Sequence, residues 1–228
     1  WGYQVIGQFQ SEEEIRNYPV NLDGNNNRTL LPGDFIYKDV NGDGIINGMD
    51  ERPIGYPEGW APIMSFGGNI GLAWKGIDLN IDLSGGAMQG WRQNYELANA
   101  YHGNGNSPVY LLEDRWHRAD LYDPESEWIP GRYPAIRKGE FSYNNKNSDF
   151  WLHNVRYLRI KNLEVGYSLP AQLLRPIRAQ KVRIYANVSN LCSFDNVGKF
   201  GVDPEITAAA AVVYPQQRTF LLGFNITY

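Results

Sequence analysis

The last ten residues of the chain alternate strictly between two kinds of side chain. One face of the implied strand carries large apolar groups: Phe220, Leu222, Phe224, Ile226 and Tyr228. The other face carries smaller or mostly polar residues: Thr219, Leu221, Gly223, Asn225 and Thr227. Such a strand suits a wall between lipid and water. It equally suits the edge of a soluble sandwich whose apolar face packs on a second sheet, so this segment alone leaves both interpretations open.

The same alternation predicts a β-hairpin earlier in the chain. One strand runs from Met64 to Trp74 and, apart from Gly68, has apolar residues at every even position. Lys75-Gly76 is the expected two-residue turn, because glycine readily supplies the positive φ that such turns need. In the second strand, Ile77, Leu79, Ile81 and Leu83 alternate with Asp78, Asn80, Asp82 and Ser84. Carboxylates at alternate positions require water on that face, which a pore or a half-exposed soluble sheet provides.

Two more strands are predicted before the last one. The first runs from Trp151 to about Leu169, and its alternation slips near Lys161-Asn162, which indicates a β-bulge. Pro170 closes it, and a helical turn interrupted by a proline is expected over 171–177. The second covers about 182–189. These strands bring the total to about five, so the predicted fold class is all-β.

Polar segments separate the predicted strands. Residues 1–60 are rich in Asn, Gly, Pro and charge, with one short helix that Ser11 caps and Glu14 supports at the capping-box spacing. This helix should end before Pro19. Residues 92–150 form a long polar insertion, and a second loop is expected over about 192–217. Loops of such length in a compact domain are usually functional.

Short and long connections alternate along residues 61–228. The turn at 75–76 and the connection 170–180 are short, whereas 92–150 and 192–217 are long. Outer-membrane barrels show this asymmetry, with short periplasmic turns and longer extracellular loops. If the short turns are periplasmic, the C-terminus also lies in the periplasm and residues 1–60 are extracellular. About five strands cannot close a barrel, which needs about eight, so further strands must come from elsewhere.

Composition narrows the function classes. The net charge of −4 gives no footprint for nucleic-acid binding. No apolar run approaches the length of a membrane-spanning helix. Aromatic residues make up 14% of the chain, and 24 glycines add to a balance that favours β structure with many turns. The single cysteine, Cys192, cannot form an internal disulfide.

The loop 39–50 has the spacing of a calcium-binding loop. Its expected ligands are the side chains of Asp39, Asn41, Asp43 and Asp50 and the carbonyl oxygen of Ile45. Gly44 stands at the sixth position, where such loops turn sharply. Aspartate at the twelfth position replaces the usual glutamate and resembles dockerin-type loops. The alternative is an Asn/Gly/Asp turn without metal; with metal, Ca²⁺ is expected to hold an exposed loop together.

Candidate chemistry elsewhere is sparse. Six aromatic residues are candidates for stacking on a ligand: Trp60, Trp91, Tyr95, Tyr101, Trp116 and Trp128. Loop packing and membrane-interface positions explain these residues as well. The three histidines show no pairing spacing, the acidic residues of 113–127 are typical of a solvated loop, and no phosphate loop or Gly-x-Ser-x-Gly is present. We therefore expect no catalytic residue.

Several blocks, taken together, resemble SusC/RagA-like TonB-dependent transporters. They are Pro-Gly-Asp-Phe-Ile-Tyr-Lys-Asp-Val-Asn-Gly-Asp-Gly at 32–44 with Asp50 and 53–55, the segment 7–10, the strand 157–170, and 190–191, 201–205, 214–215 and 223–228. The resemblance covers nearly the whole chain and matches the family's C-terminal portion. Cys192 and the terminal Tyr228, where phenylalanine is common, are minor departures.

The resemblance implies an importer in the bacterial outer membrane. Its fold would be a 22-stranded barrel with an N-terminal plug, of which this chain supplies about five C-terminal strands, surrounded by outer-membrane lipid. The implied partners are the rest of the barrel and the plug, a SusD-like surface lipoprotein, TonB acting through the part that this chain does not match, and an oligosaccharide or peptide substrate. The alternative function is a soluble extracellular glycan-binding module with a calcium-stapled loop.

Overall fold

The computed structural model describes residues 1–59, 61–137, 142–205 and 216–228. They divide into two compact units. The loop unit comprises the described residues of 1–58 and 90–154, and the sheet unit comprises those of 59–89, 155–205 and 216–228. The chain therefore leaves the loop unit, enters the sheet unit and returns before the last strands.

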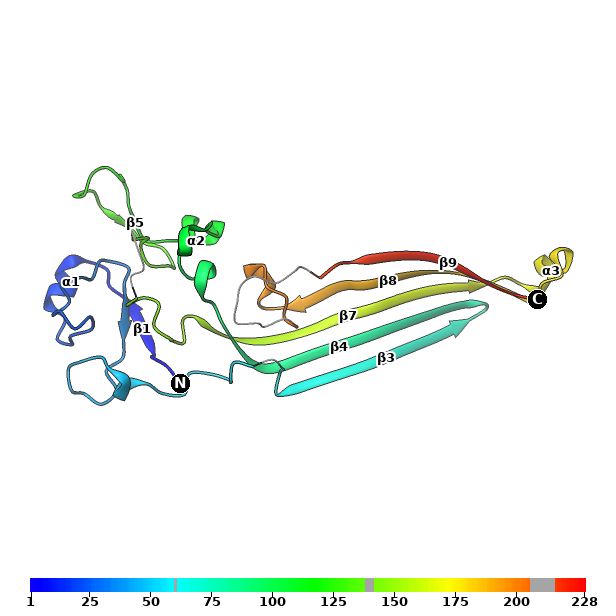
Figure 1. Cartoon of the computed structure of the whole chain (residues 1–228), viewed down its shortest axis with the longest axis horizontal. Coiled ribbons are helices and arrows are strands. Elements are labelled where there is room, and N and C mark those ends of the chain that lie inside the picture. Colours follow the sequence, from blue (N-terminus) through cyan, green and yellow to red (C-terminus); the bar gives the residue numbers. More distant parts are fainter. Residues whose placement is uncertain (60, 138–141, 206–215) are drawn as a thin grey trace. The chain divides into compact units, whose positions relative to one another are not determined.

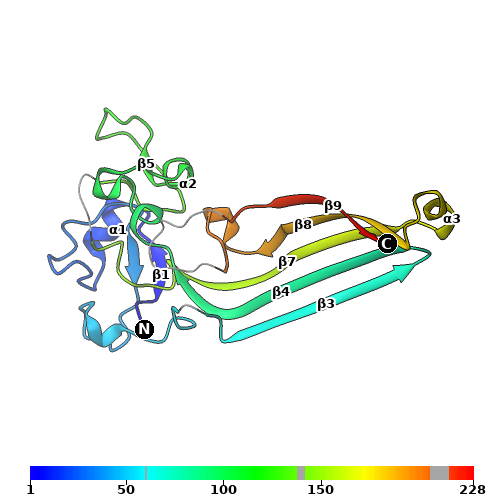
Figure 2. The same ribbon diagram turned by 45° about the vertical axis from the view of Figure 1, so that its right-hand side comes forward.

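The sheet unit is built on five strands in the order β3-β4-β7-β8-β9 (Figures 1 and 2). Their bounds are β3 (Met64–Trp74), β4 (Ile77–Arg92), β7 (Leu152–Ser168), β8 (Lys181–Asp195) and β9 (Thr219–Thr227). β3 pairs with β4, β7 with β8 and β8 with β9, in each case antiparallel. The predicted antiparallel β character is confirmed, since the secondary structure of the described residues is mostly β with a few short helices, and the five predicted strands form this sheet.

Short connections gather at one end of this sheet. The β3–β4 turn lies there with Lys75 at φ 48° and Gly76 at φ 86°, the positive values expected of the turn. The helical turns α3 (Ala171–Leu174) and η4 (Arg175–Ile177) join β7 to β8 at the same end, where the C-terminus also lies (Figure 1). Among the described residues, β3 and β9 each have one neighbour in this sheet.

The register places apolar residues opposite apolar residues at most positions of one face. Cross-strand partners on this face include Leu72 with Leu79, Ile70 with Ile81, Val165 with Ala186, Ile184 with Phe224 and Val188 with Phe220. The other face pairs polar or small residues, including Asn69 with Asp82, Glu164 with Asn187 and Arg183 with Asn225. Side chains alternate between the two sides of a strand, so these pairings give the sheet an apolar face and a polar face.

The predicted bulge between β7 and β8 is confirmed, and the extra residue lies in β8. Ile160 faces Cys192, whereas Asn162 faces Ser189. Lys161 therefore stands opposite two residues of β8, of which Asn190 has φ 53°. Asparagine tolerates this left-handed conformation better than most residues.

The bulge also explains why the predicted loop 192–217 began too early. β8 continues to Asp195, because residues 192–195 still pair with residues 157–160 of β7. The polar Asn190 stands at a position where the apolar face of β8 continues, between Val188 and Cys192, so the apolar run is interrupted after Val188. A short helical turn, η5 (Gly198–Phe200), follows the strand.

The loop unit has a hydrophobic core of its own. β1 (Val5–Gln8) pairs antiparallel with β2 (Phe35–Tyr37), two short strands that the polar pattern of residues 1–60 did not predict. The predicted helix forms as α1 (Glu12–Asn17), where the Ser11 hydroxyl accepts the N–H of Glu14 at 3.1 Å. Buried residues of this core include Phe9, Leu22, Phe35, Tyr37, Leu111, Tyr133, Tyr143 and Trp151.

The insertion 92–150 thus packs against residues 1–58, although its composition suggested a solvated loop. Its elements are η2 (Tyr95–Leu97), η3 (His102–Asn104), α2 (Val109–Glu113), β5 (His117–Arg118) and β6 (Trp128–Ile129), and η1 (Gly48–Asp50) lies in the calcium-type loop. Aromatic rings make the contact: Phe35 lies 4.4 Å from Phe150 between ring centroids. Among the described residues, no helix combines the length and the apolar character that crossing a membrane requires.

Candidate functional site

The apolar face of the sheet is exposed over much of its extent, most of all in β3 and β9, whereas Leu79, Ile81 and Leu83 of β4 are half-buried. Leu222 is 86% exposed, Phe224 70% and Trp74 68%, and the remaining large residues of this face in β3 and β9 are also exposed. Soluble monomers rarely present a continuous apolar surface of this kind. The face therefore requires an apolar environment, which lipid or a second sheet would supply.

The opposite face holds charged side chains in ion pairs. Near the short connections, the Arg183 guanidinium on β8 donates to Asp78 on β4, with Nε 3.0 Å from Oδ2, and to Glu164 on β7 at 2.6 Å. One arginine thus links three strands. Such a cluster needs neighbouring water or mutual pairing, in agreement with a hydrated face.

A second ion-pair cluster fixes the segment after η5 against the same polar face. Arg159 on β7 is 5% exposed, and its two terminal nitrogens lie 2.7 Å from Asp203 and 2.9 Å from Glu205. Lys161 contacts Glu205 at 2.5 Å, and the Ser84 hydroxyl donates to the same carboxylate at 3.1 Å. Segment 201–205 therefore folds over the polar face of β4 and β7.

The calcium-type loop is already shaped by hydrogen bonds from its own backbone. The two carboxylate oxygens of Asp39 accept the N–H groups of Gly42 and Gly44 at 2.7 and 2.8 Å. Asp43 accepts the N–H of Ile45 at 2.9 Å. The Asn41 amide nitrogen donates to Asp43 at 2.8 Å, and this bond lowers the pKa of the Asp43 carboxyl.

Asp50 closes this loop from a fully buried position. Its oxygens accept the N–H groups of Val40 and Asn47, both at 2.9 Å. Buried carboxylates are usually balanced by a cation or by several hydrogen bonds, and backbone N–H groups supply the bonds here. Within the described part of the chain, no three His, Cys, Asp or Glu side chains lie close enough together to hold a metal ion.

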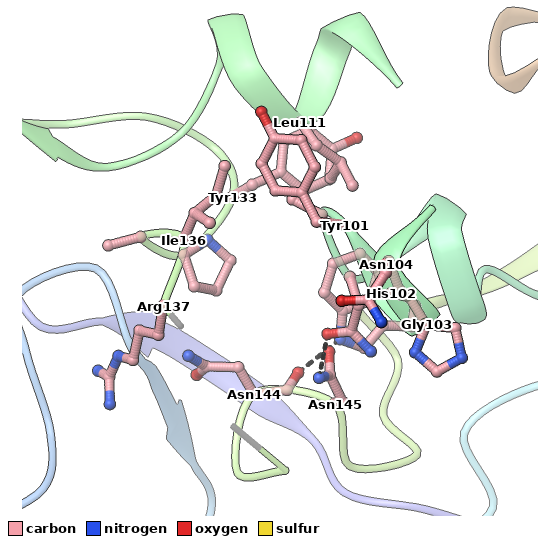
Figure 3. A pocket seen from close by; sticks show the side chains of 16 residues that line it. Tyr101, His102, Gly103, Asn104, Leu111, Tyr133, Ile136, Arg137, Asn144 and Asn145 are labelled. Atoms are coloured by element: carbon pink, nitrogen blue, oxygen red, sulfur yellow. Dashed lines mark hydrogen bonds between the residues drawn. The ribbon is translucent and has the colours of Figure 1, made fainter. Parts of the chain in front are cut away.

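A cavity of about 470 Å³ opens in the loop unit (Figure 3). Its wall is formed by three segments that are distant in sequence: 98–104, 133–137 and 144–145. Leu111 and Trp151 complete it. In Figure 3, Tyr101, Asn104 and Arg137 surround the hollow from different sides. The volume lies within the usual range for small-molecule sites.

The wall of the cavity is anchored by a buried carboxylate. Asp34 is fully buried, pairs with the Arg137 guanidinium and accepts the Asn144 amide N–H at 2.8 Å. Burial raises the pKa of the Asp34 carboxyl, while Arg137 and Asn144 oppose that shift. The Asn145 amide donates to the side-chain oxygen of Asn99 across the cavity wall. These bonds fix side chains from three segments relative to one another.

The aromatic ligand candidates occupy different environments. Trp91 is buried and stacks on the His153 ring at 5.4 Å between centroids. Trp116 is buried against Gly33, which has φ 91° and no room for a Cβ atom. Trp128 lies under the Arg118 guanidinium at 4.4 Å. Covered rings such as Trp91 and Trp116 have no free face on which a ligand could stack in this conformation.

The two tyrosines among these candidates are exposed. Tyr101 is 55% exposed and lines the cavity, and Tyr95 is 48% exposed beside His102. Trp60 lies outside the described residues. The sequence did not reveal the cavity, because Asn99 and Asn145 lie in polar segments that show no motif, and only the fold brings them together. Their sole sequence signal is the length of the insertion that contains them.

The curated proteins that this chain resembles are TonB-dependent receptors. A scan against protein-family models finds no match. The TonB-dependent receptor P3 of Formosa agariphila is 26% identical over 244 residues, which cover the whole of this chain and 22% of the relative. The TonB-dependent receptor SusC of Bacteroides thetaiotaomicron is 33% identical over 99 residues, 41% of this chain and 9% of SusC. The chain therefore spans about a fifth of the relatives that it matches in full.

Solved structures support the fold. The RagAB peptide importer in its closed-closed state matches 98% of this chain and 22% of its own with a TM-score of 0.56 at 19% identity. The open-open state matches 86% and 21% with a TM-score of 0.55 at 21% identity. Together with the curated relatives, these matches confirm the resemblance to SusC/RagA-like TonB-dependent transporters that the sequence blocks indicate.

Proposed function

We propose that this chain forms part of the barrel wall and the loops of an outer-membrane importer. The observation that carries the proposal is the five-stranded sheet with one exposed apolar face and one ion-paired polar face. Lipid would cover the apolar face, and the polar face would line the hydrated interior. The similarity to TonB-dependent receptors over the whole chain supports this assignment.

The barrel would be completed by strands outside this chain. The outer edges of β3 and β9 present backbone groups that a membrane cannot satisfy, so each edge requires a further strand. We propose a 22-stranded barrel in which β9 pairs with the first strand. The end of the sheet that carries α3 and the C-terminus would face the periplasm, and residues 1–60, 92–150 and the segment after β8 would be extracellular.

Transport would proceed by binding and conformational change, without a catalytic residue in this chain. A plug within the barrel would couple to TonB, and a SusD-like lipoprotein would cover the extracellular side. The substrate would be an oligosaccharide or a peptide. Exposed Tyr95 and Tyr101 are the candidates for ligand contact that the structure leaves accessible, whereas Trp91, Trp116 and Trp128 would support the loops.

We propose further that the loop 39–50 binds Ca²⁺ as a structural ion. The spacing of Asp39, Asn41, Asp43, Ile45 and Asp50 supports this, and the turns that place Asp39 and Asp43 are formed. Asn41 would have to turn its amide so that oxygen replaces nitrogen beside Asp43. The ion would balance the charge of the buried Asp50 and strengthen a loop that contacts the neighbouring segment through Asn21 and Gly44, whose backbones are hydrogen-bonded at 2.8 Å.

Cell fractionation and growth test the importer proposal directly. The whole protein containing this chain should be recovered from the outer membrane in a form that migrates faster on gels before boiling than after. A strain that lacks the gene should lose growth on one glycan or peptide as sole carbon source, and the gene should restore it. Recovery of the whole protein as a stable monomer without detergent would instead favour the soluble glycan-binding module.

A further inference from the structure

We propose that the cavity of the loop unit binds a neutral saccharide. The proposal starts from the side chains around the hollow. Four asparagines line it, Asn99, Asn104, Asn144 and Asn145, together with the exposed phenol of Tyr101 (Figure 3). An asparagine amide offers both donors and an acceptor. Sugar hydroxyls likewise donate and accept, so an amide-rich wall matches a polyhydroxylated ligand. Asn144, Asn145 and Asn99 already bond within the wall, so the exposed amide of Asn104 is the one most open to a ligand.

The charges around the cavity argue against an ionic ligand. Arg137 is a lining cation, but its guanidinium is paired with the buried Asp34. Among the described residues that line the cavity, none is an aspartate, a glutamate or a lysine. A sulfate or carboxylate group of an acidic saccharide would find no cation in the described wall of this cavity that is not already paired. The ammonium group of a peptide would find no carboxylate there. Uncompensated charges are costly to desolvate, so a neutral ligand fits best.

The wall is also preorganised for binding. Asn145 donates to Asn99, and Asn144 is held between Asp34 and the backbone N–H of Phe35, whose bond to the Asn144 oxygen is 3.2 Å. Fixed polar groups lose little conformational freedom when a ligand binds. Tyr101 adds an apolar ring face with a polar tip at the rim, which suits the mixed apolar and polar faces of a sugar ring.

The inference deepens the proposed importer function and rests on it, because it names the kind of solute that the loops would hold. Two substitutions test it without disturbing the backbone. Tyr101 has φ 62° and Asn104 has φ 61°, and both are exposed. Tyr101→Asn removes the ring and Asn104→Gly removes the amide, while both new residues tolerate the left-handed conformation. Asn26→Gly is the matched control, since Asn26 is exposed with φ 52° outside the cavity.

The measurement is calorimetric titration of the purified whole protein in detergent. The probes are maltohexaose, cellohexaose, xylohexaose and mannohexaose as neutral saccharides, with a sulfated oligosaccharide and an uncharged hexapeptide for comparison. We expect one of the neutral saccharides to bind the wild type. Asn104→Gly should weaken it by about two- to tenfold, as for one lost hydrogen bond, and Tyr101→Asn by roughly tenfold. Asn26→Gly should bind as the wild type does.

Three results would overturn the proposal. In the first, none of the neutral saccharides binds the wild type. In the second, a neutral saccharide binds both cavity variants and the control with equal affinity. In the third, the cavity variants weaken only the binding of the sulfated saccharide or of the peptide. The assay needs neither a membrane nor energised transport. A protein that fractionates as an outer-membrane barrel yet fails this titration would remove the cavity assignment and leave the importer proposal standing.

Discussion

Asp43 and Asp50 carry the charge of the calcium-type loop in different ways. Asp50 is buried and accepts two backbone N–H groups, so it shapes the loop whether or not a cation is bound. Asp43 is exposed and makes one backbone bond, to Ile45. The affinity of such loops for Ca²⁺ depends on the number of charged ligands. Asp43 is therefore the residue at which charge can be changed with the least effect on shape.

The substitution Asp43→Asn removes that charge and keeps an oxygen for the N–H of Ile45. We expect it to weaken Ca²⁺ binding by about tenfold or more, and to raise the protease sensitivity of residues 33–55 at limiting Ca²⁺. Calorimetric titration of the whole protein with CaCl₂ measures the affinity. Asp120→Asn is the matched control, because Asp120 accepts the N–H of Tyr122 at 2.9 Å in the same kind of turn. A wild-type protein without Ca²⁺ binding, or equal affinity in Asp43→Asn, would contradict the calcium proposal.

Single residues also mark the limit of what the sequence reveals. The Ser11 cap and the Lys75-Gly76 turn depend only on residues that are close in sequence, so the residue types and their spacing were enough to predict them. Arg159 shows no signal, because its partners Asp203 and Glu205 are more than forty residues away. From the sequence alone, each of these charged side chains would be predicted to be exposed to water. They are buried together only because the segment after η5 folds against β7.

Among the elements, β9 offers the sharpest contrast between the two faces of the sheet. Leu222 faces Ala186 on the apolar side, and its neighbour Leu221 faces Asn187 on the polar side. Arginine on the lipid face of a barrel costs roughly 2–4 kcal/mol near the middle of the membrane. The same side chain on the hydrated face should cost little.

We therefore expect Leu222→Arg to reduce strongly the amount of folded protein in the outer membrane, and Leu221→Arg to leave it nearly unchanged. The comparison is well matched, since the residues are adjacent and the replacements identical. Heat-modifiable migration of the whole protein in membrane fractions provides the measurement. Equal loss in both variants would argue that β9 is buried on both sides, as in a soluble core.

Strand periodicity predicted the elements of the sheet well, and its failures have physical causes. The alternation of β3 and β9 is unbroken, and these strands were predicted closely. In β4 the alternation is clear from Ile77 to Ser84, whereas the strand continues to Arg92 through Gly85-Gly86 and through Met88, which has φ 62°. In β8 the polar Asn190 at the bulge interrupts the apolar positions between Val188 and Cys192, so the continuation to Asp195 was taken for loop. β1 and β2 are too short to show a period, and they form because Phe35 and Tyr37 are buried in the core of the loop unit.

At the scale of the whole chain, segments of two units alternate along the sequence, and the units differ in where their apolar side chains lie. The loop unit buries aromatic residues in a conventional core, whereas the sheet unit exposes its apolar residues on one face. Averaged over both units, the mean hydropathy of the chain is −0.46. The average hides the apolar face of the sheet and the buried core to which the insertion 92–150 contributes, which is why only the position-by-position pattern and the family blocks were informative.

The most direct test of the membrane-wall proposal is the solvent accessibility of single cysteines along β3. In a Cys192→Ser background, cysteine replaces Phe66, Ile70 or Leu72 on the apolar face and Ser65, Asn69 or Ala73 on the polar face of the whole protein in outer membranes. A water-soluble maleimide should label positions 65, 69 and 73 and leave 66, 70 and 72 unlabelled until detergent or a lipid-soluble maleimide is added. Uniform labelling at all six positions, or protection on the polar face, would contradict the assignment of this sheet as a wall between lipid and water.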